Sequence, residues 1–194
     1  MKIEFLSLLG KVSQDPGNEF RHKFRIHQGW WRTAVLLEEP GPHPQWNGKF
    51  ICNTINVSEE NKRKNFLALV AFNAAEEVIG ARKEKPSGGI VQESRLWGNL
   101  LSSQPLCSNF WGPLKYNHSL ANAYLSQVIP DFGTLIEIHF EWAPQPKEDY
   151  TDDNSAFDVM IEYLDRKQRR AICGLECKYT DSLSTSQIEL ERRT

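Results

Sequence analysis

The clearest pattern of apolar and polar positions lies near the C-terminal end, where two segments predict neighbouring β-strands. Residues 156–163 read Ala-Phe-Asp-Val-Met-Ile-Glu-Tyr, and residues 172–179 read Ile-Cys-Gly-Leu-Glu-Cys-Lys-Tyr. Because residues two apart on a strand point to the same face, Glu176 and Lys178 stand side by side, opposite an apolar face of cysteine and leucine. The polar run 165–170 is typical of a hairpin turn, so we expect the two strands to pair antiparallel.

A third strand is expected just before this pair, and helices are expected earlier in the chain. Residues 134–142 separate apolar side chains on one face from glutamate and histidine on the other. Ser58 suits a helix N-cap, and Pro105 is expected to end or kink the helix before it. Helices are predicted over 5–14, 58–79, 90–104, 119–128 and 181–193, and extended segments over 19–37 and 50–56.

Asp158 lies on the first strand of the hairpin and comes near Glu176 on the second when the two strands pair. Charged groups on otherwise buried strands are costly unless they are paired or used. Two carboxylates suit Mg²⁺, which prefers oxygen ligands and keeps several waters, and the Cys177 carbonyl is a third candidate ligand. Such a metal ion activates water and stabilises charge on phosphorus oxygens, and Lys178 adds a fixed positive charge. The pattern therefore predicts a divalent-metal site for phosphodiester hydrolysis.

The acid-x-Lys pattern by itself is weak evidence, because it occurs three times in the chain. The copy at 60–62 lies in a predicted helix, where residues two apart diverge by about 200°, and the second copy lies in the predicted turn. Only the copy at 176–178 lies on an apolar strand beside a second strand that carries an acid. The alternative is a structural α/β protein in which Asp158, Glu176 and Lys178 form an ion-pair cluster.

The segments 154–158 and 174–180 resemble motifs of the PD-(D/E)xK nuclease superfamily, and more narrowly a group of restriction-endonuclease-like proteins whose strands read roughly AFD and ECKYT. Segments 25–32 and 100–107 are similar to other characteristic segments of that group, so the resemblance covers about residues 20–180. It implies an α/β fold with a restriction-endonuclease-like core, in which a mixed central sheet is flanked by helices. It also implies Mg²⁺-dependent DNA cleavage, with Mn²⁺ able to substitute, by the acid and acid-x-Lys elements.

Further residues are weaker candidates for the same site. Glu93 could donate an acid from a helix, as in some members of the superfamily, or could be a solvated glutamate at a helix start. Ser103 and Gln104 could orient water or substrate near the metal, or could cap the end of a helix. The hairpin tip carries a basic run that either contacts a nucleic-acid backbone or is only solvated: Arg166, Lys167, Arg169 and Arg170.

Composition sets limits on function. With 194 residues and 40% apolar content, the chain can build a hydrophobic core. Its net charge of −2 does not by itself indicate a nucleic-acid-binding protein. Residues 1–130 carry 15 Lys/Arg against 11 Asp/Glu, and residues 131–194 carry 8 against 14. This charge asymmetry suits a metal centre beside phosphate-contacting segments, or it arises by chance. No membrane span, secretory signal, zinc pattern or disulfide pattern is recognisable. We therefore expect a cytoplasmic protein with free thiols.

We expect the last strand of the superfamily core to be missing, because only residues 180–194 follow the second site strand. The open sheet edge needs partners, either from segments 20–37 or 50–56 or from a second copy in a homodimer, which we favour. The chain divides into an N-terminal elaboration, 1–89, and a nuclease core, 90–194, packed as one unit. DNA is favoured over RNA as the substrate. A catalytically weak or inactive nucleic-acid-binding module of the same fold is the alternative.

Overall fold

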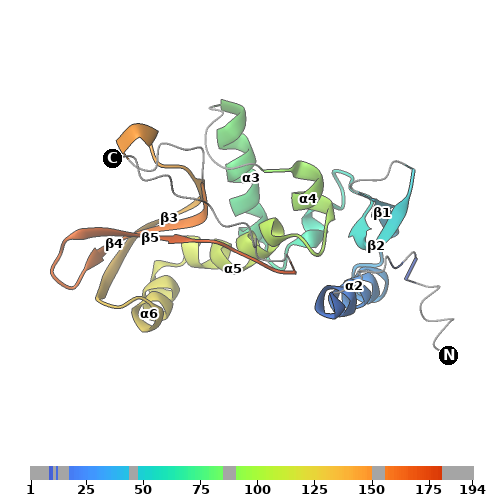
Figure 1. Cartoon of the computed structure of the whole chain (residues 1–194), viewed down its shortest axis with the longest axis horizontal. Coiled ribbons are helices and arrows are strands. Elements are labelled where there is room, and N and C mark those ends of the chain that lie inside the picture. Colours follow the sequence, from blue (N-terminus) through green and yellow to red (C-terminus); the bar gives the residue numbers. More distant parts are fainter. Residues whose placement is uncertain are drawn as a thin grey trace, which may run out of the picture.

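The computed structural model describes residues 9–10, 12, 18–43, 48–84, 91–149 and 156–180 (Figure 1). The helices are α2 (Glu19–Trp31), α3 (Leu69–Glu84), α4 (Glu93–Gly98), α5 (Ser103–Tyr116) and α6 (His118–Val128). Short π-helical or 3₁₀ turns cover Arg32–Leu36, Lys62–Asn65 and Lys147–Asp149. The strands are β1 (Pro40–Pro42), β2 (Phe50–Ile55), β3 (Phe132–Trp142), β4 (Phe157–Asp165) and β5 (Arg170–Leu175).

The larger sheet contains β3, β4 and β5 in sequence order, and both of its strand pairs are antiparallel. Val159 of β4 pairs with Leu175 of β5, so one step further along this register brings Asp158 opposite Glu176. On the other side of β4, the flanking pairs place Glu141 of β3 opposite Asp158. Glu141 of β3, Asp158 of β4 and Glu176, which follows the end of β5, therefore lie at the same end of the sheet.

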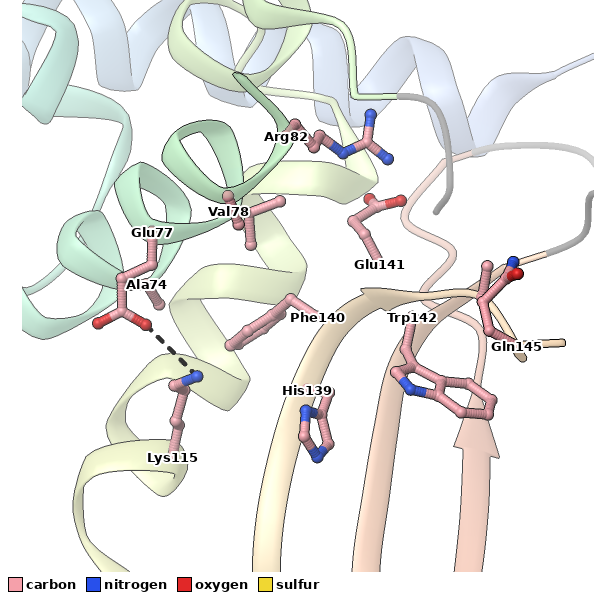
Figure 2. A pocket seen from close by; sticks show the side chains of 12 residues that line it. Ala74, Glu77, Val78, Arg82, Lys115, His139, Phe140, Glu141, Trp142 and Gln145 are labelled. Atoms are coloured by element: carbon pink, nitrogen blue, oxygen red, sulfur yellow. Dashed lines mark ion pairs between the residues drawn. The ribbon is translucent and has the colours of Figure 1, made fainter. Parts of the chain in front are cut away.

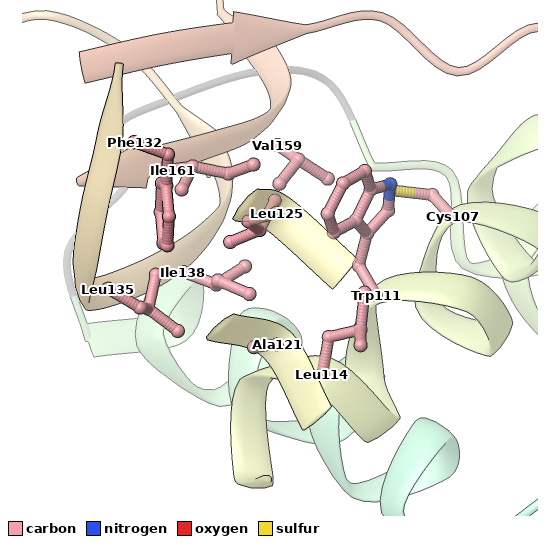
Figure 3. Close-up of a cluster of buried hydrophobic side chains, with 10 residues drawn as sticks. All are labelled: Cys107, Trp111, Leu114, Ala121, Leu125, Phe132, Leu135, Ile138, Val159 and Ile161. Atoms are coloured by element: carbon pink, nitrogen blue, oxygen red, sulfur yellow. The ribbon is translucent and has the colours of Figure 1, made fainter. Parts of the chain in front are cut away.

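The helices α5 and α6 pack on this sheet and enclose the main hydrophobic core (Figure 3). Its buried side chains are Cys107, Trp111, Leu114, Ala121, Leu125, Phe132, Leu135, Ile138, Val159 and Ile161. Cys173, Leu175 and Cys177 pack against the same cluster, as the alternation along that segment predicts. Apolar burial contributes about 25 cal/mol per Å², so this core fixes the ends of β4 and β5 where the acids lie.

A second, smaller core joins α3 and α4 to the rest of the molecule. The rings of Phe66, Phe72 and Trp97 pack against each other with centroids 5.6, 5.7 and 5.8 Å apart. Where α3 crosses α5, a Cβ on Gly112 would come within 2.8 Å of the Ala71 Cα, so the two helix backbones are in close contact. This contact couples α3 to the helix that supports the sheet.

The N-terminal part consists of α2 and the β1–β2 ribbon, which are held together by one buried arginine. Arg32 is 2% exposed. Its guanidinium donates to the carbonyl oxygens of Cys52 (2.9 Å), Leu9 (2.8 Å) and Glu38. Burial lowers the pKa of Arg32 from its ordinary value, and nearby anionic groups oppose the change. Three backbone acceptors satisfy the desolvated cation, so the side chain joins three segments of chain.

Residues 19–37 form a helix and a π-helical turn, so the extended conformation predicted for this segment is wrong. Asn18 caps the helix: its side-chain oxygen accepts a hydrogen bond from the Arg21 N–H at 2.8 Å. The helix also lies directly on β2, because a Cβ on Gly29 would be 3.0 Å from the Cys52 Cβ. Trp30 and Trp31 are residues that strands favour, but the packing of α2 on the ribbon outweighs this preference.

The helix predicted over 58–79 begins later, at Leu69, and ends later, at Glu84. Residues before it form turns and a 3₁₀ segment, because the Asn65 side chain donates to the Leu96 carbonyl oxygen at 3.0 Å. The backbone at Phe66 is then extended, which directs its ring into the second core.

The helix predicted over 90–104 is two helices, α4 and the start of α5. Pro105 does not end a helix, and this expectation is wrong. It lies in the first turn of α5, where no intrahelical N–H is required, and the Ser102 side chain caps that turn by accepting from the Gln104 N–H at 3.3 Å.

The remaining predicted elements agree with the structure to within a few residues: 50–56, 119–128, 134–142 and the two strands of the hairpin. The helices predicted over 5–14 and 181–193 lie wholly or largely outside the described residues. Antiparallel sheets flanked by helices confirm the predicted α/β class. Among the described strands, β5 has only β4 as a neighbour, so neither 20–37 nor 50–56 covers its open edge.

Candidate active site

Asp158 lies in β4 at the point where its neighbour β5 has already ended. The strand predicted to run to Tyr179 stops at Leu175, which frees the N–H groups beyond it from the sheet ladder. The Cys177 N–H donates to Asp158 Oδ2 at 2.6 Å. This bond orients the Asp158 carboxylate and ties it to the segment that carries Glu176 and Lys178. The role of the Cys177 carbonyl as a metal ligand stays a prediction.

The carboxyl groups of Asp158 and Glu176 lie close enough for the charge of Glu176 to raise the pKa of Asp158. Burial raises the pKa of Asp158, and the negative charge of Glu176 raises it further, whereas the Cys177 N–H and the Lys178 ammonium act in the opposite direction. Two adjacent carboxylates are not both ionised without cost unless a cation or a shared proton lies between them. The pair is therefore a natural position for a cation.

Lys178 is directed to the same place by an ion pair with Glu176. Its Nζ lies 3.0 Å from Glu176 Oε2, and both side chains are about half exposed. An exposed ion pair adds little stability, typically about 0–1 kcal/mol. The pair therefore keeps a positive charge beside the carboxylates, and a ligand can rearrange it at small cost.

Glu141 is the acidic neighbour that the sequence pattern did not assign to the site. Burial raises its pKa to about 7, with the charges of Asp158 and Glu176 adding to the effect and Arg82 opposing it. Its backbone is left-handed, with φ of 50°, a conformation that costs free energy for a residue other than glycine and is common at functional sites. The alternating face of residues 137–141 contained Glu141, but its position opposite Asp158 depends on a strand register that the sequence pattern did not reveal.

The oxygen donors at this point fit a hard divalent cation. Mg²⁺ is bound in proteins by one or two carboxylates and keeps the rest of its shell as water, and Asp158 and Glu176 supply two. The described residues contain no group of three His, Cys, Asp or Glu side chains already arranged around a metal position. A Mg²⁺ ion held by Asp158 and Glu176 would complete its shell with water.

Comparison with known families matches residues 14–194 to the model described as the PD-(D/E)XK nuclease superfamily. The chain belongs to the PD-(D/E)XK nuclease superfamily. Searches of curated proteins and of solved structures find no match. Membership supports a nuclease that acts on nucleic acid, and enzymes of this superfamily generally use divalent metals. The resemblance drawn from the strand motifs is thereby confirmed.

The accessory candidates for this PD-(D/E)XK site have different surroundings. Gln104 lines a small cavity of about 20 Å³ together with Glu141 and Asp158, which is room for one water molecule. Ser103 is partly buried where it opens α5. Glu93 is exposed and accepts from Trp97 Nε1 at 3.3 Å. The structure thus brings Gln104 to the carboxylates, whereas the described contacts of Glu93 lie elsewhere.

The basic hairpin lies at the far end of β4 from the PD-(D/E)XK carboxylates. Seven residues separate Asp165 from Asp158, or roughly 23 Å at about 3.3 Å per residue. Asp165 organises the turn by accepting from the Lys167 N–H (2.7 Å) and from the Arg169 N–H (2.9 Å). Arg169 also pairs with Asp165, and Arg170 pairs with Glu162 on β4.

Arg166 and Lys167 are exposed at the tip of this hairpin. Any nucleic-acid contact made there involves a phosphate distant from the one at the carboxylates, because of the length of the strand. Separately, no helix in the described part of the chain is both long enough and apolar enough to cross a membrane.

Proposed function

We propose that the protein is a Mg²⁺-dependent endodeoxyribonuclease of restriction type, with Asp158, Glu176 and Lys178 as its catalytic residues. The observation that carries the proposal is the adjacent pair of Asp158 and Glu176 carboxyl groups, held by the Cys177 N–H and flanked by Lys178. Membership in the nuclease superfamily supports the reaction class. DNA as the substrate, and internal cleavage, are the finer parts of the proposal.

Each residue of the proposed site has a separate role in phosphodiester hydrolysis. A bound divalent ion supplies Lewis-acid polarisation of the phosphate and a water of lowered pKa. Asp158 and Glu176 would hold that ion, and the Cys177 N–H fixes the orientation of Asp158. Lys178 keeps a positive charge where negative charge develops on phosphorus oxygens. Gln104 lines the water-sized cavity beside Asp158 and would orient a water there.

The test is a cleavage assay on supercoiled plasmid, linear duplex and single-stranded RNA. We expect nicked and linear plasmid in Mg²⁺ or Mn²⁺, no product in excess chelator, and binding without cleavage in Ca²⁺, whose looser coordination does not position the water. Equal cleavage in chelator would contradict the proposal. Binding to DNA with no cleavage in any of these metals would instead identify an inactive binding module of the same fold.

A further inference from the structure

A cleft of about 470 Å³ lies between helix α3 and the end of β3, beside the proposed active site (Figure 2). One wall is formed by the α3 residues Ala74, Glu77, Val78, Ala81 and Arg82, and the other by β3 and the residues after it. The cleft shares Val78, Phe140 and Glu141 with the small cavity that reaches Asp158. The cleft therefore adjoins the cavity that Asp158 lines.

One nitrogen of the Arg82 guanidinium lacks a hydrogen-bond acceptor. Its Nη2 atom is buried and forms no hydrogen bond within the described part of the chain. A buried donor without a partner costs about 1–3 kcal/mol, more when it is charged, and usually indicates a missing ligand or water. Figure 2 shows Arg82 above Glu141, another residue that lines the cleft.

Acidic side chains lie near the other basic groups of the cleft. Lys115 Nζ lies 3.4 Å from Glu77 Oε2 across the inner wall. His139 Nε2 lies 3.6 Å from Glu137 and 3.9 Å from Glu162, so it faces acids on the sheet. Arg82 faces Glu141, but its buried Nη2 still lacks a hydrogen-bond partner within the described part of the chain, as does the buried His139 Nε2.

An aromatic side chain completes the lining. The indole of Trp142 stacks with the ring of Phe157 on β4, with centroids 6.4 Å apart and planes 11° from parallel. This pair is held between two strands, so Trp142 is presented to the cleft in a fixed orientation. A cation beside an aromatic ring is the combination that binds the phosphate and base of single-stranded nucleic acid.

The volume of the cleft suits a small occupant rather than a double helix. A cavity of about 470 Å³ lies within the range of small-molecule pockets, about 300–1,000 Å³, and holds one nucleotide. A base that remains paired and stacked in a duplex does not fit. Entry therefore requires a single-stranded stretch or a nucleotide turned out of the helix.

We propose that this cleft binds one unpaired nucleotide of the substrate strand, with its phosphate on Arg82 and its base against Trp142. The inference rests on the proposed nuclease function, because it places the occupant next to the phosphodiester that is cut. It extends that function by assigning a preference for substrates with unpaired nucleotides.

The test is the binding of a fluorescein-labelled hexathymidylate, followed by fluorescence anisotropy in Ca²⁺ so that it is not cut. We expect Arg82→Gln to weaken binding at least tenfold and to lower the salt slope by about 0.7, and Arg82→Lys to recover part of the loss. The matched control is Lys83→Gln, which removes an exposed charge one residue away. Equal affinities for the Arg82→Gln and Lys83→Gln proteins would overturn the inference.

A second variant keeps the test decisive if Arg82→Gln does not fold. Ala81 is exposed and lines the cleft, so Ala81→Trp should fill it and weaken hexathymidylate binding at least tenfold. Asn73→Trp, exposed on α3 outside the cleft, is its control. Equal effects of the two substitutions would contradict the inference. The inference would also be contradicted if Arg82→Gln weakened binding of a fully paired DNA duplex as strongly as it weakens binding of the hexamer.

Binding of hexauridylate, compared with hexathymidylate, shows whether the cleft takes its nucleotide from RNA or from DNA.

The outcomes separate this inference from the nuclease proposal. Arg82-dependent binding with no cleavage of any substrate would support the cleft and refute the nuclease. Metal-dependent cleavage that is the same in the Arg82→Gln and Lys83→Gln proteins would support the nuclease and refute the cleft.

Discussion

At the scale of residues, burial is the first cause of the raised pKa values of Asp158 and Glu141. The charge of Glu176 raises both pKa values further, and the charge of Asp158 also raises that of Glu141. In the absence of a cation this arrangement opposes folding once the acids ionise. The proposed divalent ion would relieve this free-energy cost.

Glu141 makes this cost measurable as a pH dependence of stability. Its pKa rises from 4.5 to about 7 on folding, so the folded state holds a proton that the unfolded state loses. The free energy of unfolding in chelator should therefore fall as pH rises from about 4.5 to about 7, by on the order of 2 kcal/mol because partial exposure screens part of the repulsion. Glu141→Gln should flatten this decline.

The measurement is urea denaturation of the wild-type and Glu141→Gln proteins between about pH 5 and pH 8, with the exposed Glu60→Gln as control. Parallel pH curves for the wild-type and Glu141→Gln proteins would show that Glu141 is not the strained group.

The sequence could predict Asp158 and Glu176 because they lie on alternating strands that join in a short hairpin, where register follows from the turn. Glu141 could not be assigned in the same way. Its side-chain direction depends on a left-handed backbone at that residue, which no local pattern indicated. Arg82 also escaped prediction, since it reaches the site from a helix more than fifty residues earlier in the chain.

At the scale of elements, helix α2 holds the segment that follows the acid-x-Lys motif. Arg21 Nε and Nη2 donate to the Thr180 carbonyl oxygen at 3.0 and 2.8 Å. Gln28 donates to the Tyr179 hydroxyl at 2.8 Å, and Phe24 packs edge-on against the Tyr179 ring. Because β5 ends at Leu175, these contacts replace strand pairing as the support for the residues after Lys178.

Arg21→Gln should therefore loosen the motif segment more than the whole fold. We expect amide hydrogen exchange to become at least tenfold faster over residues 176–180, with a loss of global stability of about 1–2 kcal/mol from the charged hydrogen bonds. Exposed Lys23→Gln on the same helix is the control. Unchanged exchange over 176–180 in the Arg21→Gln protein would mean that α2 does not support this segment.

The segment 19–37, predicted as extended, is helical because of contacts that lie far away in the sequence. It packs on β2 and bonds to residues about 150 positions later. Local propensity is a weak guide when tertiary packing of this kind decides the conformation. The strands of the main core and the helix α6, by contrast, carried apolar periodicity of their own and were predicted to within a few residues. Most of α5 was missed, because Pro105 was expected to end a helix and instead lies in the first turn of one.

At the scale of the whole molecule, the described sheet has an open edge at β5. We propose that a second copy of the chain covers it and that the protein is a homodimer, which would also place two active sites on two DNA strands. The division into an N-terminal elaboration, 1–89, and a core, 90–194, is likewise a proposal. Tight packing of α3 on α5 across that boundary favours a single folded unit.

Light scattering at micromolar concentration tests the dimer. We expect twice the 22.3 kDa mass of one chain, and we expect Ile172→Lys, which places a charge on an exposed β5 residue, to shift the protein toward monomer. Lys167→Gln at the hairpin tip is the control. A strict monomer in the wild type would contradict the proposed dimer.

The most direct test of the central claim is the rate of plasmid cleavage in Mg²⁺ for variants of the carboxylate pair. Asp158→Asn, Glu176→Gln and Lys178→Gln should each reduce the rate by about 100-fold or more while circular dichroism remains native. Glu162→Gln, which removes another partly buried carboxylate from β4, should cleave at a rate within about threefold of wild type. Wild-type cleavage rates in the Asp158→Asn or Glu176→Gln proteins would show that the metal-dependent site proposed at the ends of β4 and β5 is not where the reaction occurs.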